Sequence, residues 1–351
     1  INGPLRPSYG GYFEHFLLQF SLIKIIMAST KVKIPTIDFS NVELKPNTPL
    51  WESTKIQVFE ALQEYGCFVA IYDHKVLNEI REGMFDATKG IFEFPLETKL
   101  KNLSKKPLHG YLGMLPSVPL YESLCIPDLL NPQSVENFGN IFWPQDGNPD
   151  FCNLVKSYSN PLVELDEMVK RMILENLGLK NQINEFMDPN YMLFRFTRYK
   201  GSSNISCGDD ENNNESTTGL AGHTDSTLLT IISQNEVNGL QIKKNEEWID
   251  VNISPNSYVV LSGDCFKAWT NGRLHSPLHR VVSSGGESDR LSIQLFSLAK
   301  PGHLIEAPKE LVDEQNPLLF KPFETLALLE YVTGEGAYGP PSDGFKAYCG
   351  V

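Results

Sequence analysis

The sequence has few of the features that mark a disulfide-bonded or metal-thiolate protein. Its six cysteines are scattered over 351 residues, with no Cys-x-x-Cys pair and no cluster. This distribution argues against a disulfide framework and a thiolate zinc site, and it fits a reducing compartment. Glycine and proline, with 26 and 23 residues, are not in excess, and the sequence shows no internal repeat. Collagenous, disordered and coiled-coil chains are therefore excluded.

Positive charge and long apolar runs are also scarce. The chain has 30 basic and 43 acidic residues, which gives a net charge of −13 that would repel polyanions. The apolar stretch at residues 16–26 is interrupted by polar side chains. It is also too short to span a bilayer, which takes about 20 residues. We therefore expect no nucleic-acid partner and no membrane partner. The reducing compartment that the cysteines indicate predicts a cytoplasmic location, and a monomer is taken as the default.

The chain divides by its sequence texture into four parts. We expect Met27 to begin the folded protein, with residues 1–26 a leader or translated upstream sequence rather than a targeting peptide. Residues 27–190 have helical periodicity, residues 191–300 have strand patterns, and residues 301–351 contain a last helix and a tail. This organisation predicts an α+β fold with a mainly β core.

Three long helices are expected in the N-terminal part. The first follows Ser53 as N-cap and ends at Gly66, and the second covers residues 77–91, where apolar residues recur three and four apart. The third begins with Asn160 as its cap and Pro161 in its first turn.

Short runs rich in Val, Ile, Thr and aromatic residues predict the strands, most of them in an antiparallel sandwich or barrel. The expected strands are residues 67–71, 191–199, 228–233, 240–242, 248–251, 258–261, 279–283 and 291–298. The polar stretch 201–218 cannot bury a core, so we expect a mobile surface loop there. A closing helix is expected over residues 322–332.

Two histidines and an aspartate form the first chemical signal. His223 and Asp225 are two residues apart, and on a strand such side chains point from one face, so both could reach one ion. His279 begins another predicted strand, and two imidazoles with one carboxylate suit non-haem Fe(II). Taken alone, the first pair would more often be a structural hydrogen bond. His275 is a competing ligand, but Pro277 disfavours the helix that its spacing from His279 would need.

Polar residues on the last predicted strand form the second signal. Arg290 and Ser292 share one strand face, and a guanidinium inside a barrel needs an anion, for which a planar carboxylate is well suited. A structural ion pair is the alternative for Arg290. Phe296 lies on the same face and fits either substrate contact or the core. Arg195 could occupy the same interior or pair with an acid elsewhere, and its role stays open.

The set His223-x-Asp225, His279 and Arg290-x-Ser292 resembles the plant soluble 2-oxoglutarate and Fe(II)-dependent dioxygenases. The resemblance extends over nearly all of residues 34–332. Its landmarks are IPTIDFS from Ile34, HGYLG from His109, TNGRLHSPLHRV from Thr270, RLSIQLF from Arg290 and NPLLFKPF from Asn316. It implies a double-stranded β-helix, or jelly roll, flanked by N-terminal and C-terminal helices.

The resemblance also implies roles for the site residues. It assigns three metal ligands: His223, Asp225 and His279. It assigns three residues to the distal carboxylate of 2-oxoglutarate: Arg290, Ser292 and Tyr199. Tyr199 is placed by the segment LFRFTRYKG, in which Thr197 stands where the family often has Asn.

The implied activity is an oxygenase that couples decarboxylation of 2-oxoglutarate, to succinate and CO2, with oxidation of a C–H bond in a small plant specialised metabolite. Hydroxylation is the default, and desaturation or dealkylation stays open. Fe(II), 2-oxoglutarate, O2 and ascorbate as reductant are the implied cofactors. The most similar branch is that of the glucosinolate-modifying and steroidal-alkaloid-hydroxylating dioxygenases.

Contacts with the organic substrate are expected from Phe296, Met114 and Tyr331. Two alternatives remain. One is an ascorbate-using oxidase of the same fold, like aminocyclopropane-carboxylate oxidase. The other is a catalytically silent protein that binds a small molecule.

Overall fold

The computed structural model describes residues 33–201, 218–282, 286–334 and 344–351. The expected leader and nearly all of the expected 201–218 loop lie outside these residues. From Ile34 to Val351 the chain forms one unit. No helix within the described residues is both long and apolar enough to cross a membrane.

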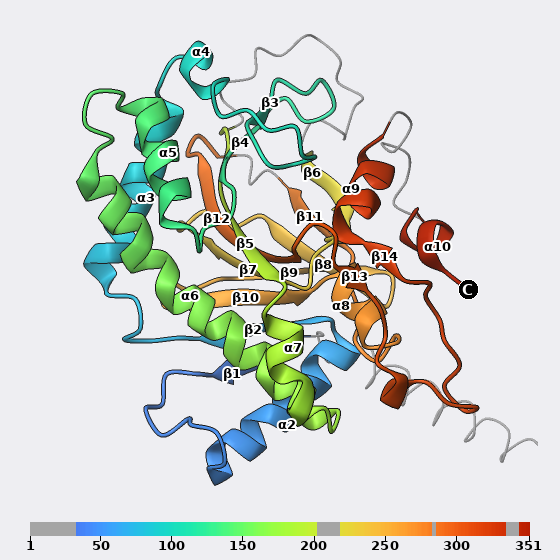
Figure 1. Ribbon diagram of the computed structural model, residues 1–351. Coiled ribbons are helices and arrows are strands. Elements are labelled where there is room, and N and C mark those ends of the chain that lie inside the picture. The colour runs from blue at the N-terminus through green and yellow to red at the C-terminus, as the bar shows by residue number, and fades with distance from the viewer. Residues whose placement is uncertain (1–32, 202–217, 283–285, 335–343) are drawn as a thin grey trace, which may run out of the picture. The chain divides into compact units, whose positions relative to one another are not determined.

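Two β-sheets form the centre of this unit (Figure 1). The larger contains, in spatial order, β1 (Thr36–Asp38), β2 (Cys67–Ile71), β10 (Ser257–Ser262), β7 (Leu229–Gln234), β12 (Arg290–Ala299), β5 (Asn190–Tyr199), β4 (Tyr121–Ile126) and β3 (Leu112–Gly113). The smaller contains β6 (Thr218–His223), β11 (His279–Val282), β8 (Leu240–Lys244) and β9 (Glu247–Asp250). Apart from the parallel β1–β2 pair, neighbouring strands in both sheets are antiparallel. The expected strands are confirmed as β2, β5 and β7 to β12.

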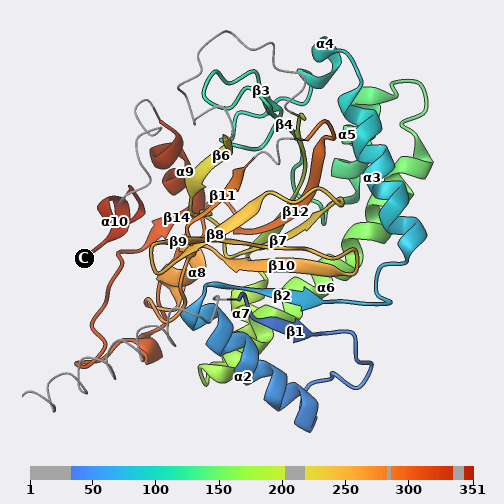
Figure 2. The ribbon, with the colours of Figure 1, turned by 180° about the vertical axis from the view of Figure 1, so that it is seen from behind.

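Long helices cover one face of the larger sheet, as Figures 1 and 2 both show. They are α2 (Pro49–Glu64), α3 (Asn78–Phe92), α5 (Pro132–Phe142) and α6 (Pro149–Asn176). The shorter helices are α4 (Leu96–Lys99), α7 (Ile183–Met187), α8 (Asp264–Trp269), α9 (Thr325–Thr333) and α10 (Gly344–Cys349). The expected closing helix is α9, and the two-residue strand β14 (Phe323–Glu324) occupies its expected beginning.

The beginning of α2 differs from the sequence expectation. Its N-cap is Thr48, whose hydroxyl accepts a hydrogen bond from the backbone N–H of Trp51 at 3.2 Å, and Pro49 occupies the first turn. Ser53 lies inside the helix instead. Thr48 and Pro49 provide both a side-chain cap and a preset φ angle, so the helix starts one turn earlier. The end is as expected, since Gly66 follows the helix with a φ of +71°.

The beginning of α6 is also earlier than expected. Asn148 is its cap and accepts from the N–H of Phe151 at 3.0 Å, with Pro149 in the first turn. Pro161, expected as a first-turn residue after Asn160, lies inside the helix. A proline there removes one backbone hydrogen bond. Burial of the apolar side of α6 against the sheet offsets this loss, which sequence pattern alone did not indicate.

Strands β5 and β12 have one apolar face, and their other face is polar from Arg195 to Tyr199 and from Arg290 to Gln294. Phe194, Phe196, Ile293 and Leu295 belong to the core cluster that the helices share. Because side chains alternate along a strand, the residues between them point to the opposite side of the sheet. These residues are buried as well: Arg195, Thr197, Tyr199, Arg290, Ser292 and Gln294. A hydrophobic core thus holds in place two strands whose other face is polar.

The described cysteines are free and buried, in agreement with the absence of a disulfide framework. They are Cys67, Cys125, Cys152, Cys265 and Cys349. Burial raises the pKa of each of these thiols. They therefore remain protonated thiols at neutral pH.

Helix α6 contains a buried ion pair. The Nζ of Lys170 lies 2.7 Å from the Oδ2 of Asp166, and the side chains are 0% and 1% exposed. Each charge has lost its hydration and is compensated mainly by the other. Removal of one partner would leave an uncompensated charge in the core.

We expect Lys170→Met to lower the free energy of unfolding by about 3–5 kcal/mol, because Asp166 is then buried without its cation. The double variant Lys170→Met/Asp166→Leu should recover most of this loss. Urea denaturation followed by circular dichroism measures both. The control Lys243→Met removes the lysine of an ion pair whose partner, Glu246, is 90% exposed, and it should cost less than about 1 kcal/mol. Equal costs for the single and double variants would contradict the prediction.

Candidate metal and co-substrate site

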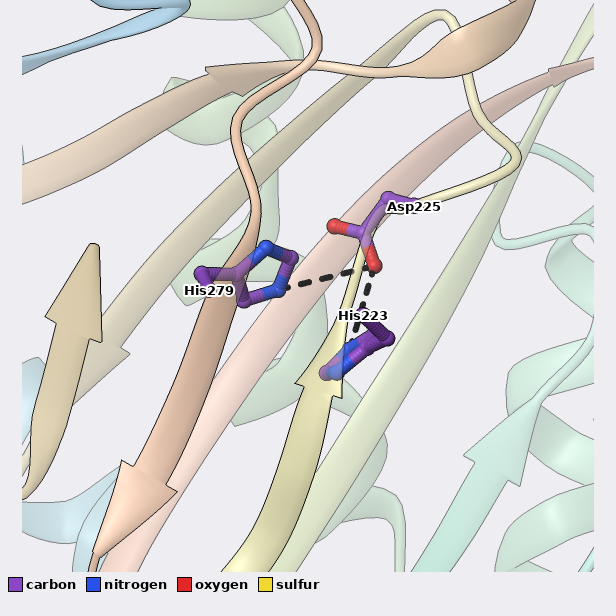
Figure 3. Close-up of side chains that lie close together, drawn as sticks. All are labelled: His223, Asp225 and His279. Atoms are coloured by element: carbon purple, nitrogen blue, oxygen red, sulfur yellow. Dashed lines mark ion pairs between the residues drawn. The ribbon is translucent and has the colours of Figure 1, made fainter. Parts of the chain in front are cut away.

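Three side chains converge at one end of the smaller sheet (Figure 3). His223 is the last residue of β6 and pairs in register with His279, the first residue of β11. The Oδ1 of Asp225 is 3.7 Å from the Nε2 of His223 and 3.8 Å from the Nε2 of His279. One ligand atom from each residue lies within 4.8 Å of the other two. A single ion can therefore contact all three, as the sequence predicted.

The reason why these residues meet differs from the expectation. The sequence placed His223 and Asp225 on one strand, but β6 ends at His223, and Asp225 lies in the connection to β7. The backbone carbonyl of Asp225 accepts from the N–H of Asp264 at 2.7 Å, and its Oδ2 accepts from the hydroxyl of Thr230 at 2.7 Å. Hydrogen bonds from α8 and β7, rather than strand alternation, orient the carboxylate.

Both imidazoles present Nε2 to the site. The Nδ1 of His223 is 2.9 Å from the carbonyl of Ala221, and the Nδ1 of His279 is 3.1 Å from the carbonyl of Pro277. A carbonyl can only accept, so each Nδ1 carries a proton and Nε2 is the nitrogen of each ring that can bind an ion. Desolvation, followed by the proximity of His279, lowers the pKa of His223 to about 4. The donor set is thus two imidazole Nε2 atoms and one carboxylate, which fits Fe(II).

Arg290 is a buried cation that meets no carboxylate among the described residues. It is 4% exposed, its Nη2 donates to the Oε1 of Gln234 at 2.9 Å, and its Nη1 donates to the Oγ of Ser292 at 3.4 Å. Its Nε has no acceptor within the described chain. Burial of a guanidinium with only neutral partners is costly. The position is therefore suited to an anionic ligand.

Tyr199 lies opposite Arg290 on the neighbouring strand. The two residues pair in register, and the guanidinium carbon is 5.1 Å from the centre of the tyrosine ring. Burial raises the pKa of the Tyr199 hydroxyl, which therefore stays protonated and can donate. Two glycines leave room here, Gly219 in β6 and Gly239 just before β8. A Cβ on Gly219 would lie 2.9 Å from the Tyr199 ring, and a Cβ on Gly239 would lie 3.2 Å from the Cδ of Arg290.

Ser292 is positioned to donate its own proton. Its Oγ accepts from the Nη1 of Arg290 at 3.4 Å and from the Nε2 of Gln294 at 2.7 Å. The Oε1 of Gln294 accepts in turn from the hydroxyl of Thr197 at 3.0 Å. With its lone pairs engaged, the Ser292 hydroxyl has its hydrogen free for an added acceptor. Ser292, Tyr199 and Arg290 thus form a set of donors that suits a carboxylate.

Three further residues of this site were missed in the sequence. Thr230 and Gln234 lie two residues to either side of Ile232 on β7, and Gln294 lies two residues beyond Ser292 on β12. Because side chains alternate along a strand, their spacing of two residues was the only signal in the sequence that placed them on the same face. Threonine and glutamine are common on strands and surfaces, so their types alone did not identify them.

The predicted substrate residues lie in different surroundings. Phe296 is on the polar side of β12, opposite Thr230 in register, and therefore close to the residue that orients Asp225. Met114 and Tyr331 are 71% and 51% exposed. In both Figures 1 and 2 the β3 region and α9, which carry them, lie on the same side of the molecule as β6. Contact of these three with a substrate stays a prediction.

Comparison with known proteins identifies the family. Residues 34–118 match a profile described as the N-terminal region of non-haem dioxygenases in morphine synthesis, and residues 192–299 match the 2OG-Fe(II) oxygenase superfamily. A probable 2-oxoglutarate-dependent dioxygenase of Arabidopsis thaliana, AOP1.2, is 41% identical over 308 residues, which cover 88% of this chain and 93% of the relative. The chain belongs to the plant 2-oxoglutarate/Fe(II)-dependent dioxygenases. This dioxygenase is also 30% identical to AOP3 of Arabidopsis thaliana, over 93% of this chain and 99% of AOP3.

A solved structure supports the fold of the dioxygenase. The dioxygenase for auxin oxidation 1 of Arabidopsis thaliana, in a binary complex with 2-oxoglutarate, has 27% sequence identity and a TM-score of 0.70. The match covers 81% of this chain and all of that one. The predicted double-stranded β-helix with flanking helices is confirmed. The predicted enzyme class, in plant specialised metabolism and dependent on iron and 2-oxoglutarate, is confirmed as well.

We expect Thr230→Val to weaken divalent metal binding about tenfold to hundredfold, because the hydrogen bond that orients Asp225 is lost. Asp225→Ala should abolish binding, since it removes the anionic member of the donor set. Calorimetric titration with Mn(II) under anaerobic conditions measures both affinities. The control Thr88→Val removes a buried hydroxyl of α3 that bonds the carbonyl of Met84, and it should leave metal affinity unchanged. Normal metal binding by Asp225→Ala would show that the donor set is wrong.

Proposed function

We propose that this dioxygenase couples the conversion of 2-oxoglutarate and O2 into succinate and CO2 to the hydroxylation of a C–H bond in a small plant specialised metabolite. One atom of O2 enters succinate and the other enters the product hydroxyl. The metal ligands would be His223, Asp225 and His279. The distal carboxylate of 2-oxoglutarate would be bound by Arg290, Ser292 and Tyr199.

The observation that carries this proposal is the buried Arg290 guanidinium. Its protein partners are neutral, its Nε lacks an acceptor within the described residues, and two hydroxyl groups lie beside it. A dicarboxylate whose far end binds there satisfies the charge, and its keto-acid end is then free to reach the metal. The resemblance to a solved relative in complex with 2-oxoglutarate supports the same assignment.

Bound iron would supply the redox chemistry that activates O2, and the protein supplies orientation. Thr230 fixes the carboxylate of Asp225, and backbone carbonyls fix the two imidazoles. The side chain of His223 is 36% exposed, whereas that of His279 is 5% exposed. The site is therefore open on the His223 side, which we assign to the approach of the organic substrate.

The remaining roles follow from location. Phe296 would contact the substrate from the barrel wall, and Met114 and Tyr331 would contact it from the rim. Ascorbate would keep the iron reduced between turnovers. The buried free thiols support a reducing, cytoplasmic location, and we propose a monomer because the site is formed within one chain.

Arg290→Met is expected to raise the dissociation constant of 2-oxoglutarate about a hundredfold or more, because a charge-assisted interaction with the carboxylate is lost. Mn(II) affinity should stay unchanged, since the metal ligands are untouched. Anaerobic titration of the metal-loaded protein with 2-oxoglutarate measures the effect. The control Arg280→Met removes an arginine of β11 that lies over Trp248, 4.1 Å from the ring centre, and should not affect 2-oxoglutarate binding. Unchanged affinity in Arg290→Met would place the carboxylate elsewhere.

Turnover distinguishes the proposed reaction from its alternatives. With plant metabolites as candidate substrates, we expect one succinate to form for each oxidised product, measured by mass spectrometry with 2-oxoglutarate in excess. Product formation that consumes ascorbate without succinate would instead indicate an ascorbate-using oxidase. Metabolite binding without Fe(II) binding would indicate a silent binding protein.

A further inference from the structure

We propose that the organic substrate carries an oxyanion group, such as a carboxylate or sulfate, and that Arg195 binds this group. The inference rests on the proposed function, because it concerns the molecule that is oxidised beside the metal ligands. It assigns a second anion site inside the barrel, separate from the one for 2-oxoglutarate.

Arg195 lies on the polar face of β5 and is 6% exposed. It pairs in register with Gln294 of β12. Its Nη1 donates to the hydroxyl of Ser123 at 2.6 Å, and its Nη2 donates to the backbone carbonyl of Leu108. Both acceptors are neutral. A guanidinium has five N–H groups, so three remain without an acceptor among the described residues.

The other buried cations of the described chain show how unusual this is. Four of the six buried lysines and arginines among the described residues have a carboxylate within 4.0 Å: Arg81 with Glu236, Lys99 with Glu122, Lys170 with Asp166, and Arg198 with Glu93. Arg195 and Arg290 are the exceptions within the described residues. A bound dicarboxylate explains Arg290, and the same argument favours a second anion at Arg195.

One 2-oxoglutarate molecule cannot satisfy both arginines with its distal carboxylate. Arg195 and Tyr199, the partner of Arg290 in register, are four residues apart on β5, which corresponds to about 13 Å of strand. Along β12, Gln294 lies between Ser292 and Phe296. Arg195 is therefore level with the part of the barrel between the 2-oxoglutarate donors and the proposed substrate residue Phe296.

The segment that Arg195 contacts through the carbonyl of Leu108 is rich in positive charge. Between Glu97 and Glu122 the sequence has no acidic residue, although the chain as a whole has a net charge of −13. Of the four lysines there, Lys99 is paired with Glu122, and three remain: Lys101, Lys105 and Lys106. A cavity of about 380 Å³ is lined by residues 102–112, which include Lys105 and Lys106, and by Thr333 of α9. Positive potential beside such a cavity concentrates anions from solution.

Exposed apolar side chains beside this cavity indicate that the ligand also has an apolar part. Leu103 and Met114 are 79% and 71% exposed, and Leu108 is 39% exposed. Exposed apolar groups beside lysines favour a molecule that combines an anionic end with an apolar body. The oxyanion would contact Arg195, and the apolar body would contact Phe296.

The test uses the folded chain loaded with Mn(II) and 2-oxoglutarate, in which no oxidation occurs. It is titrated with phenylacetate, benzyl sulfate and the neutral phenylacetamide by calorimetry. We expect at least one anion to bind about tenfold or more tightly than the amide, and the tighter anion identifies the preferred group. Broadening of its proton signals by Mn(II) should place it beside the metal.

Arg195→Met should remove the preference for the anion over the amide, while Mn(II) and 2-oxoglutarate affinities stay unchanged and show that the variant is folded. If Arg195→Met does not fold, Arg195→Lys keeps the charge without the planar fork, and should retain a preference that is several-fold smaller. The control Arg171→Met should behave as the wild type.

Equal binding of anion and amide by the wild type, or no binding of any of the three, would overturn the inference. So would a preference that survives in Arg195→Met, or one that Arg195→Lys retains in full. Failure of the wild type to bind Mn(II) and 2-oxoglutarate would instead overturn the proposed function. The two failures are therefore distinguishable in one set of titrations.

Discussion

The charge of Arg290, which is 4% exposed and has only neutral protein partners, is the constraint on which the rest of the site depends. A folded chain that buries such a charge is less stable than one that pairs it, so the position has value only if a ligand completes it. The surroundings of the guanidinium are consistent with this condition. The Oγ of Ser292 and the amide of Gln234 hold the side chain in place, and no described carboxylate competes for it.

The barrel keeps such a polar interior because its strands are fixed from outside. Strand β12 is hydrogen-bonded to β5 on one side and to β7 on the other, and its outward residues Ile293 and Leu295 are 0% and 1% exposed in the helix-covered core. The apolar face therefore provides the stability, and the opposite face is free to carry arginine, serine and glutamine. Gly219 and Gly239 allow the smaller sheet to approach these long side chains closely.

Sequence reasoning succeeded where the determining interactions are local. The period of two along a strand was enough to place Arg290 and Ser292 on one face. It failed for Asp225, whose orientation depends on Asp264 and Thr230, two residues that the pattern did not connect to it. The carboxylate lies beside the two imidazoles, but for a geometric reason other than strand alternation.

The first residues of two helices were also predicted incorrectly from the sequence. Each misplaced start had an alternative cap upstream: Thr48 before Pro49, and Asn148 before Pro149. Pro161 is tolerated inside α6 because tertiary packing outweighs its missing hydrogen bond, and no local pattern reports packing. The position of Arg195 was open for the same reason, since only the fold shows which acids lie within its reach.

The buried thiols affect how this dioxygenase withstands its own chemistry. Iron, O2 and a reductant together produce oxidants, and cysteine is attacked mainly as an exposed thiolate. Each described cysteine is buried and protonated, so this route of damage is closed in the described part of the chain. Met114, 71% exposed, is instead the sulfur most open to oxidation there. We therefore expect oxidation to modify the surface thioether of Met114 first. Sulfoxide formation there is reversible and leaves the core packing intact.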